Sequence, residues 1–198
     1  MLRIGLTGGI GSGKTTVSDY FQSLYNIPII DADKISHKLI SPQGGAYKEV
    51  VELFGRESTL VSGEIDRKFI RQRIFETPEL RDSLEQIIHP KVQHSIIKQC
   101  EKLLADYCLI VIPLLIESGM QSTVDRILIV QTEKNLQISR VMMRDECSES
   151  HVESIIDTQL SMEEKLKHAD DIIINNGTHD SLITQIEQLH QKYLALSR

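Results

Sequence analysis

A glycine-rich segment near the start of the chain combines residue types that bind phosphate groups. Residues 8–15, GGIGSGKT, match the pattern G-x-x-x-x-G-K-S/T at every fixed position. The glycines let successive backbone N–H groups converge on an anion, and the helix that we expect to begin near Gly13 adds the positive end of its dipole. We predict that Lys14 reaches the β- and γ-phosphates of a nucleotide and that Thr15 offers its hydroxyl to magnesium. The alternative is a glycine-rich turn with a solvated lysine.

Asp33 is a carboxylate whose position suits the activation of an acceptor hydroxyl. It follows the strand predicted at residues 27–30, and ligands of open α/β sheets bind at the carboxyl ends of the strands. A carboxylate there would orient the hydroxyl and take its proton late in a loose transition state. Asp33 could instead cap a helix over residues 34–40, while Asp31 ends the strand or shares the magnesium shell. The residue types and spacing leave these alternatives open.

Two groups of basic residues could bind anions, and the first lies in the middle of the chain. Arg67, Lys68, Arg71 and Arg73 fall within seven positions. After a turn at Gly63, the first three could face one side of a helix. The alternative is a solvated surface, because a run of charges usually marks one.

The second group is Arg140 and Arg144, which are four positions apart and would project together from a helix. The polar segment around them could move as a lid, in which arginine neutralises charge on a transferring phosphoryl group and excludes water. We predict that both arginines contact ATP. The alternative is that Asp145 and Glu146 pair with them on an exposed face.

His89 and Asn176 are further candidates. His89 precedes Pro90 at an expected break between two helices, where it could contact substrate or be a buried turn histidine bonded to backbone. Asn176 follows the last predicted strand, between Asn175 and Gly177, and its amide could read the adenine of ATP. A type I′ turn would explain the same three residues. The seven histidines show no spacing typical of zinc ligands, so a zinc site is not expected.

The elements that position these residues follow from the apolar pattern. Short apolar runs predict five strands, at residues 2–7, 27–30, 109–112, 127–130 and 172–174. Pro28 indicates that the second strand begins at a sheet edge or at its own first residue. Helices are expected between the strands, with a buried stripe formed by Val17, Tyr20, Phe21 and Leu24. Residues 34–104 and 134–168 are also predicted to be helical, so the chain is expected to form a right-handed parallel α/β sheet with a helical insertion and a charged arm.

The composition narrows the class of protein. With 198 residues, 40% hydrophobic and 25% charged, the chain is expected to be an ordinary globular protein. The longest apolar run, residues 109–116, is too short to span a membrane, and the first residues lack a secretory signal, so we expect a cytoplasmic location. The net charge of −6 disfavours nucleic acid as a partner. The three cysteines form no C-x-x-C pair and are expected to pack in the interior.

The chain resembles the dephospho-coenzyme A kinase family over almost its entire length. The resemblance lies in the order and spacing of LTGGIGSGKTT, Asp31-Ala32-Asp33, Ile88-His89-Pro90, Pro113-Leu114-Leu115-Ile116-Glu117, Gln159, and Ala169-Asp170-Asp171 through Asn176-Gly177. Two departures are mild. Ile116 stands where the family usually has Phe, and a branched apolar side chain still packs; Thr15 replaces the more usual Ser, and either hydroxyl can bind magnesium.

The resemblance implies a P-loop NTPase three-layer fold and an enzyme that uses ATP and Mg²⁺ to phosphorylate the ribose 3′-hydroxyl of dephospho-coenzyme A, the last step of coenzyme A synthesis. It implies a single domain, with a core at about 1–33, 105–133 and 169–198, an acceptor-binding insertion at 34–104 and a lid at 134–168. No membrane or nucleic-acid partner is expected, and the chain is expected to be a monomer or a weak homo-oligomer.

The resemblance also implies roles for individual residues. The residues expected to bind ATP are Gly11, Ser12, Gly13, Lys14, Thr15, Thr16, Arg140, Arg144 and Asn176. Asp33, Arg67 and His89 are expected to bind the acceptor, and Lys14, Asp33 and Arg140 to be catalytic. It favours Asp33 as a base or a magnesium-side ligand without deciding between the two. Other possibilities are a kinase for another nucleoside or nucleotide, and a nucleotide-dependent switch, although the chain has no N-K-x-D guanine signature.

Overall fold

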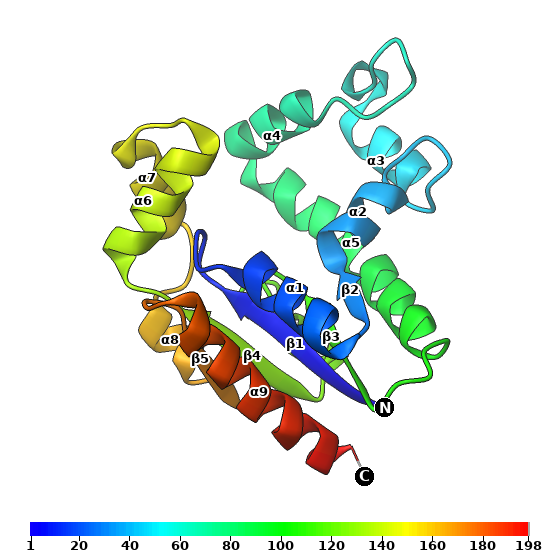
Figure 1. Ribbon diagram of the computed structural model, residues 1–198. Coiled ribbons are helices and arrows are strands. Elements are labelled where there is room, and N and C mark those ends of the chain that lie inside the picture. Colours follow the sequence, from blue (N-terminus) through cyan, green and yellow to red (C-terminus); the bar gives the residue numbers. More distant parts are fainter. Residues whose placement is uncertain (198) are drawn as a thin grey trace. The chain divides into compact units, whose positions relative to one another are not determined.

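The computed structural model describes residues 1–197 and contains a five-stranded sheet (Figure 1). The strands are β1 (Leu2–Gly8), β2 (Ile29–Asp31), β3 (Tyr107–Val111), β4 (Arg126–Gln131) and β5 (Asp171–Ile174). Their order in the sheet is β2-β3-β1-β4-β5, and every neighbouring pair is parallel. The predicted parallel α/β fold is therefore confirmed.

The strand sequences fit their places in the sheet. Tyr107, Cys108, Leu109 and Ile110 of the inner strand β3 are each fully buried, as expected for a strand covered on both faces. The edge strand β5 alternates instead, with Ile173 buried and Ile172 and Ile174 exposed. Strand β2 occupies the other edge, directly after Pro28, which confirms the edge position that this proline predicted.

Helices α1 (Lys14–Tyr25) and α9 (His179–Leu196) pack against each other and against one face of the sheet (Figure 1). Phe21 and Tyr193 are fully buried there and stack with ring centroids 6.4 Å apart. Leu24 is exposed, which corrects the predicted stripe: in the last turn of α1, Tyr25 packs against the core and Leu24 does not. On the opposite face, a Cβ at Gly5 would lie 2.9 Å from side chains of Leu115 and Val124, in the segment that includes η2 (Met120–Thr123).

The charged arm is helical, as predicted. It consists of α6 (Lys134–Asp145), α7 (Glu149–Asp157) and α8 (Met162–Leu166). Helices α6 and α7 lie side by side and share an apolar cluster of Ile138, Val141 and Val152 (Figure 1). Side chains of Ser148 and Ser161 cap α7 and α8 by accepting hydrogen bonds from backbone N–H groups, so the sequence itself marks where these helices begin.

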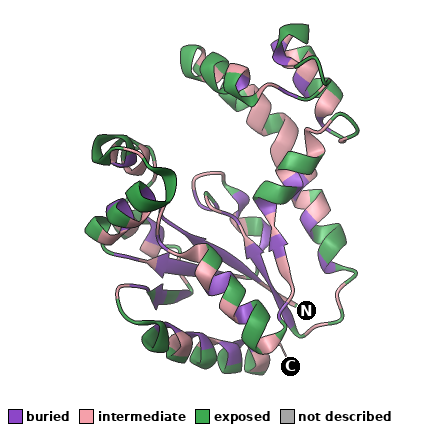
Figure 2. Ribbon diagram, turned by 45° about the horizontal axis from the view of Figure 1, so that its top comes forward, coloured by how far each residue is buried: buried purple, intermediate pink, exposed green. Residues whose placement is uncertain are grey.

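The chain divides into two compact units, one of residues 1–31 and 99–198 and one of residues 32–98. The second unit contains α2 (Ala32–Leu39), α3 (Tyr47–Phe54), η1 (Arg56–Ser58), α4 (Arg67–Glu76) and most of α5 (Pro78–Cys100). It has its own core of Ala46, Val50, Phe54, Ile65 and Ile70. In Figure 2 its outward helical surfaces are exposed, whereas the strands of the first unit are largely buried.

Two expectations for the insertion are corrected. Residues 34–104 are not helical throughout, because segments 40–46, 55–66 and 101–106 contain turns, and Gly55 and Gly63 adopt positive φ. The break expected at His89-Pro90 is absent, since α5 continues through Pro90. A proline removes one helical hydrogen bond, but its fixed φ suits a helix, so packing can keep the helix continuous.

None of the helices formed by residues 1–197 is both long and apolar enough to cross a membrane. Arg198, the last residue of the predicted core segment 169–198, lies outside the described residues.

Candidate active site

The glycine-rich loop connects β1 to α1, the position that its sequence predicted. Helix α1 begins at Lys14, directly after Gly13 in the left-handed conformation with a φ of 93°. The Lys14 ammonium lies over the loop and donates hydrogen bonds of 2.9 Å to the carbonyls of Gly8 and Gly9. The loop therefore presents a cation beside the N-terminus of a 12-residue helix, and both features favour an anionic group.

Two of the loop glycines are required by close neighbours. Gly11 has a φ of 69°, and a Cβ there would lie 2.6 Å from the carbonyl oxygen of Gln137 and 2.9 Å from Val141, both on α6. A Cβ at Gly13 would collide with the side-chain amide of Asn175. The loop thus packs directly on α6 and on the residues that follow β5.

Two buried side chains bind the backbone of the loop. The Asn175 amide nitrogen donates to the Ser12 carbonyl at 2.8 Å, and the Thr132 hydroxyl donates to the same oxygen at 3.0 Å. Both side chains are buried. Asn175 therefore positions the loop, a role that its place in an Asn-Asn-Gly segment did not reveal.

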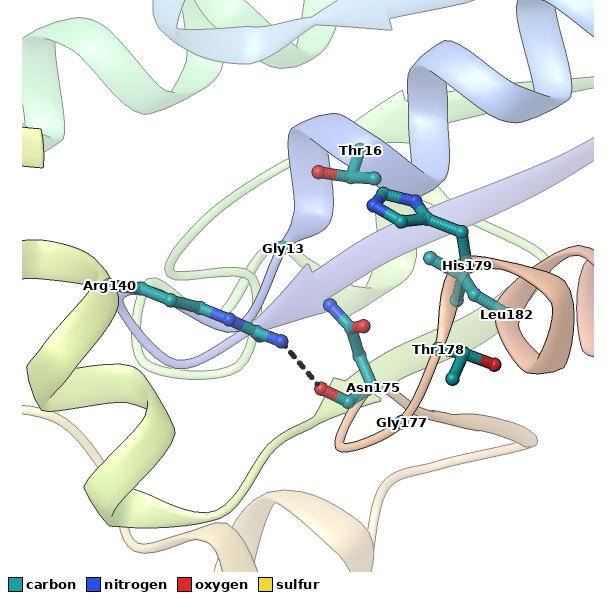
Figure 3. Close-up of a pocket in the computed structure, with 8 residues that line it drawn as sticks. All are labelled: Gly13, Thr16, Arg140, Asn175, Gly177, Thr178, His179 and Leu182. Atoms are coloured by element: carbon teal, nitrogen blue, oxygen red, sulfur yellow. Dashed lines mark hydrogen bonds between the residues drawn. The ribbon is translucent and has the colours of Figure 1, made fainter.

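The side chain of Arg140, on α6, extends toward Asn175 and the loop (Figure 3). Its Nη2 donates to the Asn175 carbonyl at 3.1 Å, whereas its Nη1 is buried and has no hydrogen-bond partner among residues 1–197. A buried charged donor without an acceptor is uncommon, because its desolvation is not repaid. The arrangement leaves Nη1 able to bind an anion.

Arg140 also lines a cavity of about 200 Å³ beside the loop (Figure 3). The other lining residues are Gly13, Thr16, Asn175, Gly177, Thr178, His179 and Leu182. The Nδ1 of His179 lies 2.8 Å from the hydroxyl of Tyr20 on α1, and this contact fixes the imidazole at the cavity wall. Sequence reasoning missed His179, although Thr178, which caps α9, marks where the helix and its first side chains begin.

The amide of Asn176 is engaged elsewhere. Its Oδ1 accepts a 2.9 Å hydrogen bond from the backbone of Glu133, and its Nδ2 donates to the Glu133 carboxylate at 3.1 Å. A type I′ turn needs positive φ, which neither Asn176 nor Gly177 adopts, so that alternative is wrong. Recognition of adenine by Asn176 stays a prediction.

Arg144 differs from Arg140. It is exposed and binds the Asp145 carboxylate through Nε and Nη2, both at 2.7 Å, as the alternative interpretation predicted. This hydrogen bonding raises the pKa of Arg144 and lowers the pKa of Asp145. Contact between Arg144 and ATP stays a prediction.

The oxygen donors named for magnesium are a hydroxyl and two carboxylates. Thr15 is exposed in the first turn of α1, and Asp31 is the half-buried last residue of β2. Asp33 is exposed in the first turn of α2, which begins at Ala32, so its interpretation as the cap of a helix over residues 34–40 is wrong. Within residues 1–197, no three His, Cys, Asp or Glu side chains form a metal cluster. A hydroxyl ligand fits a magnesium ion whose other ligands are nucleotide phosphates and water.

The unit of residues 32–98 brings two of the four basic residues together. Arg67 and Arg71, one turn apart on α4, line an apolar cavity of about 250 Å³. The other lining residues are Ile40, Val50, Ile65, Ile70, Ile74, Leu84 and Ile88. Arg67 Nη1 lies 2.6 Å from Nε2 of His37, whereas Arg73 Nη1 is 3.6 Å from the carboxylate of Glu76.

His89 does not have the environment of a buried turn histidine. It lies inside α5 and is half-buried, so that alternative is wrong. Its contact with an acceptor stays a prediction.

Known proteins are similar to this chain over almost its entire length. The sequence profile of a family described as dephospho-CoA kinase matches residues 2–181. A relative named dephospho-CoA kinase from Vibrio vulnificus is 41% identical over 197 residues, which cover 100% of this chain and 98% of the relative. Among solved structures, dephospho-CoA kinase from Campylobacter jejuni is 29% identical, with a TM-score of 0.73 over 99% of this chain and 98% of its own. A Thermus thermophilus protein, also 29% identical, has a TM-score of 0.83 over 98% and 97% of the two chains.

Proposed function

The chain belongs to the dephospho-CoA kinase family, and from this premise we propose that it transfers the γ-phosphoryl group of ATP to the ribose 3′-hydroxyl of dephospho-coenzyme A. The products are ADP and coenzyme A. The observation that carries the proposal is the extent of the family match, which includes the phosphate loop and the whole unit of residues 32–98.

The donor phosphates are proposed to bind at the loop of residues 8–15. Lys14 and the N-terminus of α1 supply positive charge, and Nη1 of Arg140 supplies a buried donor that has no acceptor within residues 1–197. Such preorganised donors stabilise the charge that develops on a transferring phosphoryl group, because they need no reorganisation during the reaction. We assign ATP contacts to Gly11, Ser12, Gly13, Thr15 and Thr16 in the same loop.

Magnesium is proposed to bind beside the loop through the Thr15 hydroxyl, with Asp31 or Asp33 near its ligand shell. When bound with ATP, the ion neutralises charge on the β- and γ-phosphates. The exposed position of Thr15 in the first turn of α1 supports this assignment.

The acceptor is proposed to bind to the unit of residues 32–98. Dephospho-coenzyme A carries a pyrophosphate and a long pantetheine arm, so its site needs cations beside an apolar surface. The cavity lined by Arg67 and Arg71 offers both features, and this supports a role for Arg67 in binding the pyrophosphate. His89, on α5 of the same unit, is kept as an acceptor contact.

The proposed reaction is a single displacement. The acceptor 3′-oxygen forms a bond to the γ-phosphorus while the bond from that phosphorus to the β,γ-bridging oxygen breaks, so ADP leaves. Asp33 orients the 3′-hydroxyl and accepts its proton late in the transfer. A cytoplasmic location and a monomeric or weakly oligomeric chain are retained as predictions from the sequence.

Product identification tests the proposal. The protein is incubated with ATP, Mg²⁺ and dephospho-coenzyme A, and the products are analysed by ³¹P NMR and mass spectrometry. We expect one new phosphomonoester on the 3′-oxygen and one ADP per coenzyme A formed. ADP release without a phosphorylated acceptor, or phosphorylation at another position, would contradict the assignment.

A further inference from the structure

Two residues of the family pattern, Glu117 and Gln159, have no role in the proposed reaction, yet they belong to one polar network around a buried lysine. Lys165 of α8 is 1% exposed, and its ammonium lies 2.9 Å from Glu117 Oε1 and 3.4 Å from Gln159 Oε1. Glu117 Oε1 also accepts a 3.3 Å hydrogen bond from the backbone of Leu160. The network thus ties the turn after β3 to the connection between α7 and α8.

The same network reaches the phosphate loop. Gln159 Oε1 accepts a 3.2 Å hydrogen bond from the backbone N–H of Ile10, in the middle of the loop. The Ile10 side chain packs against the cluster shared by α6 and α7. The backbone of Ile10 is therefore bound to the connection between α7 and α8. Its side chain packs against α6 and α7.

The network is a costly way to obtain stability alone. Burying an ammonium and a carboxylate costs free energy that the attraction between them often only just recovers. The second carboxylate oxygen of Glu117 is buried and has no hydrogen-bond partner among the described residues, which adds to the cost. A buried pair that stabilises little can still fix the position of the group bound to it, which here is the amide oxygen of Gln159.

We propose that Gln159 is a positioning residue for phosphoryl transfer, and this inference rests on the proposed function. By holding the Ile10 N–H, Gln159 fixes the phosphate loop relative to α6, the helix that carries Arg140. Lys165 and Glu117 in turn hold the Gln159 amide in place. The loop and Arg140 consequently meet the ATP phosphates as one preorganised set, although Gln159 acts through Ile10 rather than on the phosphates.

The test compares Gln159→Leu with a matched control, Gln185→Leu. Gln185 makes the same type of bond, since its Oε1 accepts from the backbone N–H of Ile174 on the edge strand β5 at 2.9 Å. Steady-state kinetics with ATP and dephospho-coenzyme A, thermal melting, binding of a non-hydrolysable ATP analogue and amide exchange at Ile10 are measured for each chain.

For Gln159→Leu we expect kcat/KM for ATP to fall about tenfold or more, with KM for dephospho-coenzyme A within about twofold of wild type. Ile10 amide exchange should accelerate and analogue binding should weaken. In Gln159→Asn the side-chain amide is retained but lies one methylene farther from Ile10. This variant should therefore also lower kcat/KM for ATP and accelerate exchange of the Ile10 amide. Gln185→Leu should leave Ile10 exchange and the ATP kinetics unchanged.

Unchanged ATP kinetics and Ile10 exchange in folded Gln159→Leu and Gln159→Asn would overturn the inference. It would also be overturned if Gln185→Leu lost as much ATP efficiency, or if both Gln159 variants failed to fold, because Gln159 would then serve general stability. Failure of the proposed function is distinguishable: wild type would not phosphorylate dephospho-coenzyme A, while analogue binding and Ile10 exchange would still respond to Gln159.

Discussion

Arg140 and Arg144 show how two equally spaced side chains acquire different roles. The i, i+4 spacing predicts that both project from one helix, and both do lie on α6. Nη1 of Arg140 is buried and has no hydrogen-bond partner in the part of the chain that the structure describes, whereas Arg144 is exposed and already neutralised by Asp145. The difference depends on how deeply each guanidinium is buried and on which group it binds. Neither property can be predicted from the spacing of the two arginines in the sequence.

We expect Arg140→Ala to lower kcat/KM for ATP by roughly 100-fold, because it removes a preorganised donor beside the phosphate loop. Arg144→Ala, the comparison variant, should lower it by less than about threefold, since an exposed, paired arginine contributes little. Initial rates at varied ATP, together with thermal melting, check both values. Equal losses in the two variants would contradict the assignment of the anion-binding role to Arg140.

The phosphate loop and α6 are elements far apart in the sequence that pack directly against each other. Two loop glycines lie against Gln137 of α6, and Gly11 also lies against Val141. The loop motif alone predicted the strand, the turn and the helix that follows, because its glycines and lysine act locally. It did not predict which later helix packs on the loop, since that contact joins residues more than 120 positions apart.

We expect Gly11→Ala to impair both stability and ATP binding, because the new methyl group would push α6 from the loop. Gly119→Ala is the matched control: its φ is 66° against 69° for Gly11, and a Cβ there would have no atom within 4 Å. Both variants carry the backbone strain of a positive φ, about 1–2 kcal/mol, so the difference between them isolates the contact with α6. Urea unfolding and ATP titration measure it, and equal effects of the two variants would refute the packing argument.

Pro90 shows where local rules failed. A proline in the sequence predicts a helix end, yet α5 runs from Pro78 to Cys100 through this residue. Its partly buried residues Leu80, Leu84 and Ile87 pack against the core of the second unit, and this tertiary packing outweighs the lost hydrogen bond. The five strands were predictable because each is a short apolar run, and three-dimensional packing reinforced that pattern instead of opposing it.

Across the molecule, buried titratable groups make stability depend on pH. His190 of α9 is 9% exposed, stacks on Tyr25 with ring centroids 3.9 Å apart, and lies 2.7 Å from the Tyr107 hydroxyl through Nδ1. Burial lowers the pKa of His190. In the unfolded chain, His190 has its ordinary pKa of about 6.5 and is protonated more readily than in the folded chain. The stability that neutral His190 provides above that pH is therefore lost as the pH falls.

We therefore expect the free energy of unfolding to decrease as pH is lowered from about 7.5 to about 5.5. His190→Gln keeps a polar side chain near Tyr107 but does not titrate; it should be less stable at neutral pH and should show a smaller decrease. Urea denaturation at the two pH values measures the effect. An unchanged pH dependence in His190→Gln would show that other groups produce it.

We propose that ATP binds to the unit that contains the phosphate loop and that the acceptor binds to the unit of residues 32–98. A comparison of acceptors therefore tests the proposed function most directly. kcat/KM is measured for dephospho-coenzyme A, adenosine and AMP in wild type and in Arg67→Ala. We expect dephospho-coenzyme A to be preferred at least ~100-fold, about 2.7 kcal/mol of transition-state binding. Arg67→Ala should reduce that preference by weakening only the acceptor that carries a pyrophosphate. Equal efficiency with AMP and dephospho-coenzyme A in wild type would contradict the proposed function.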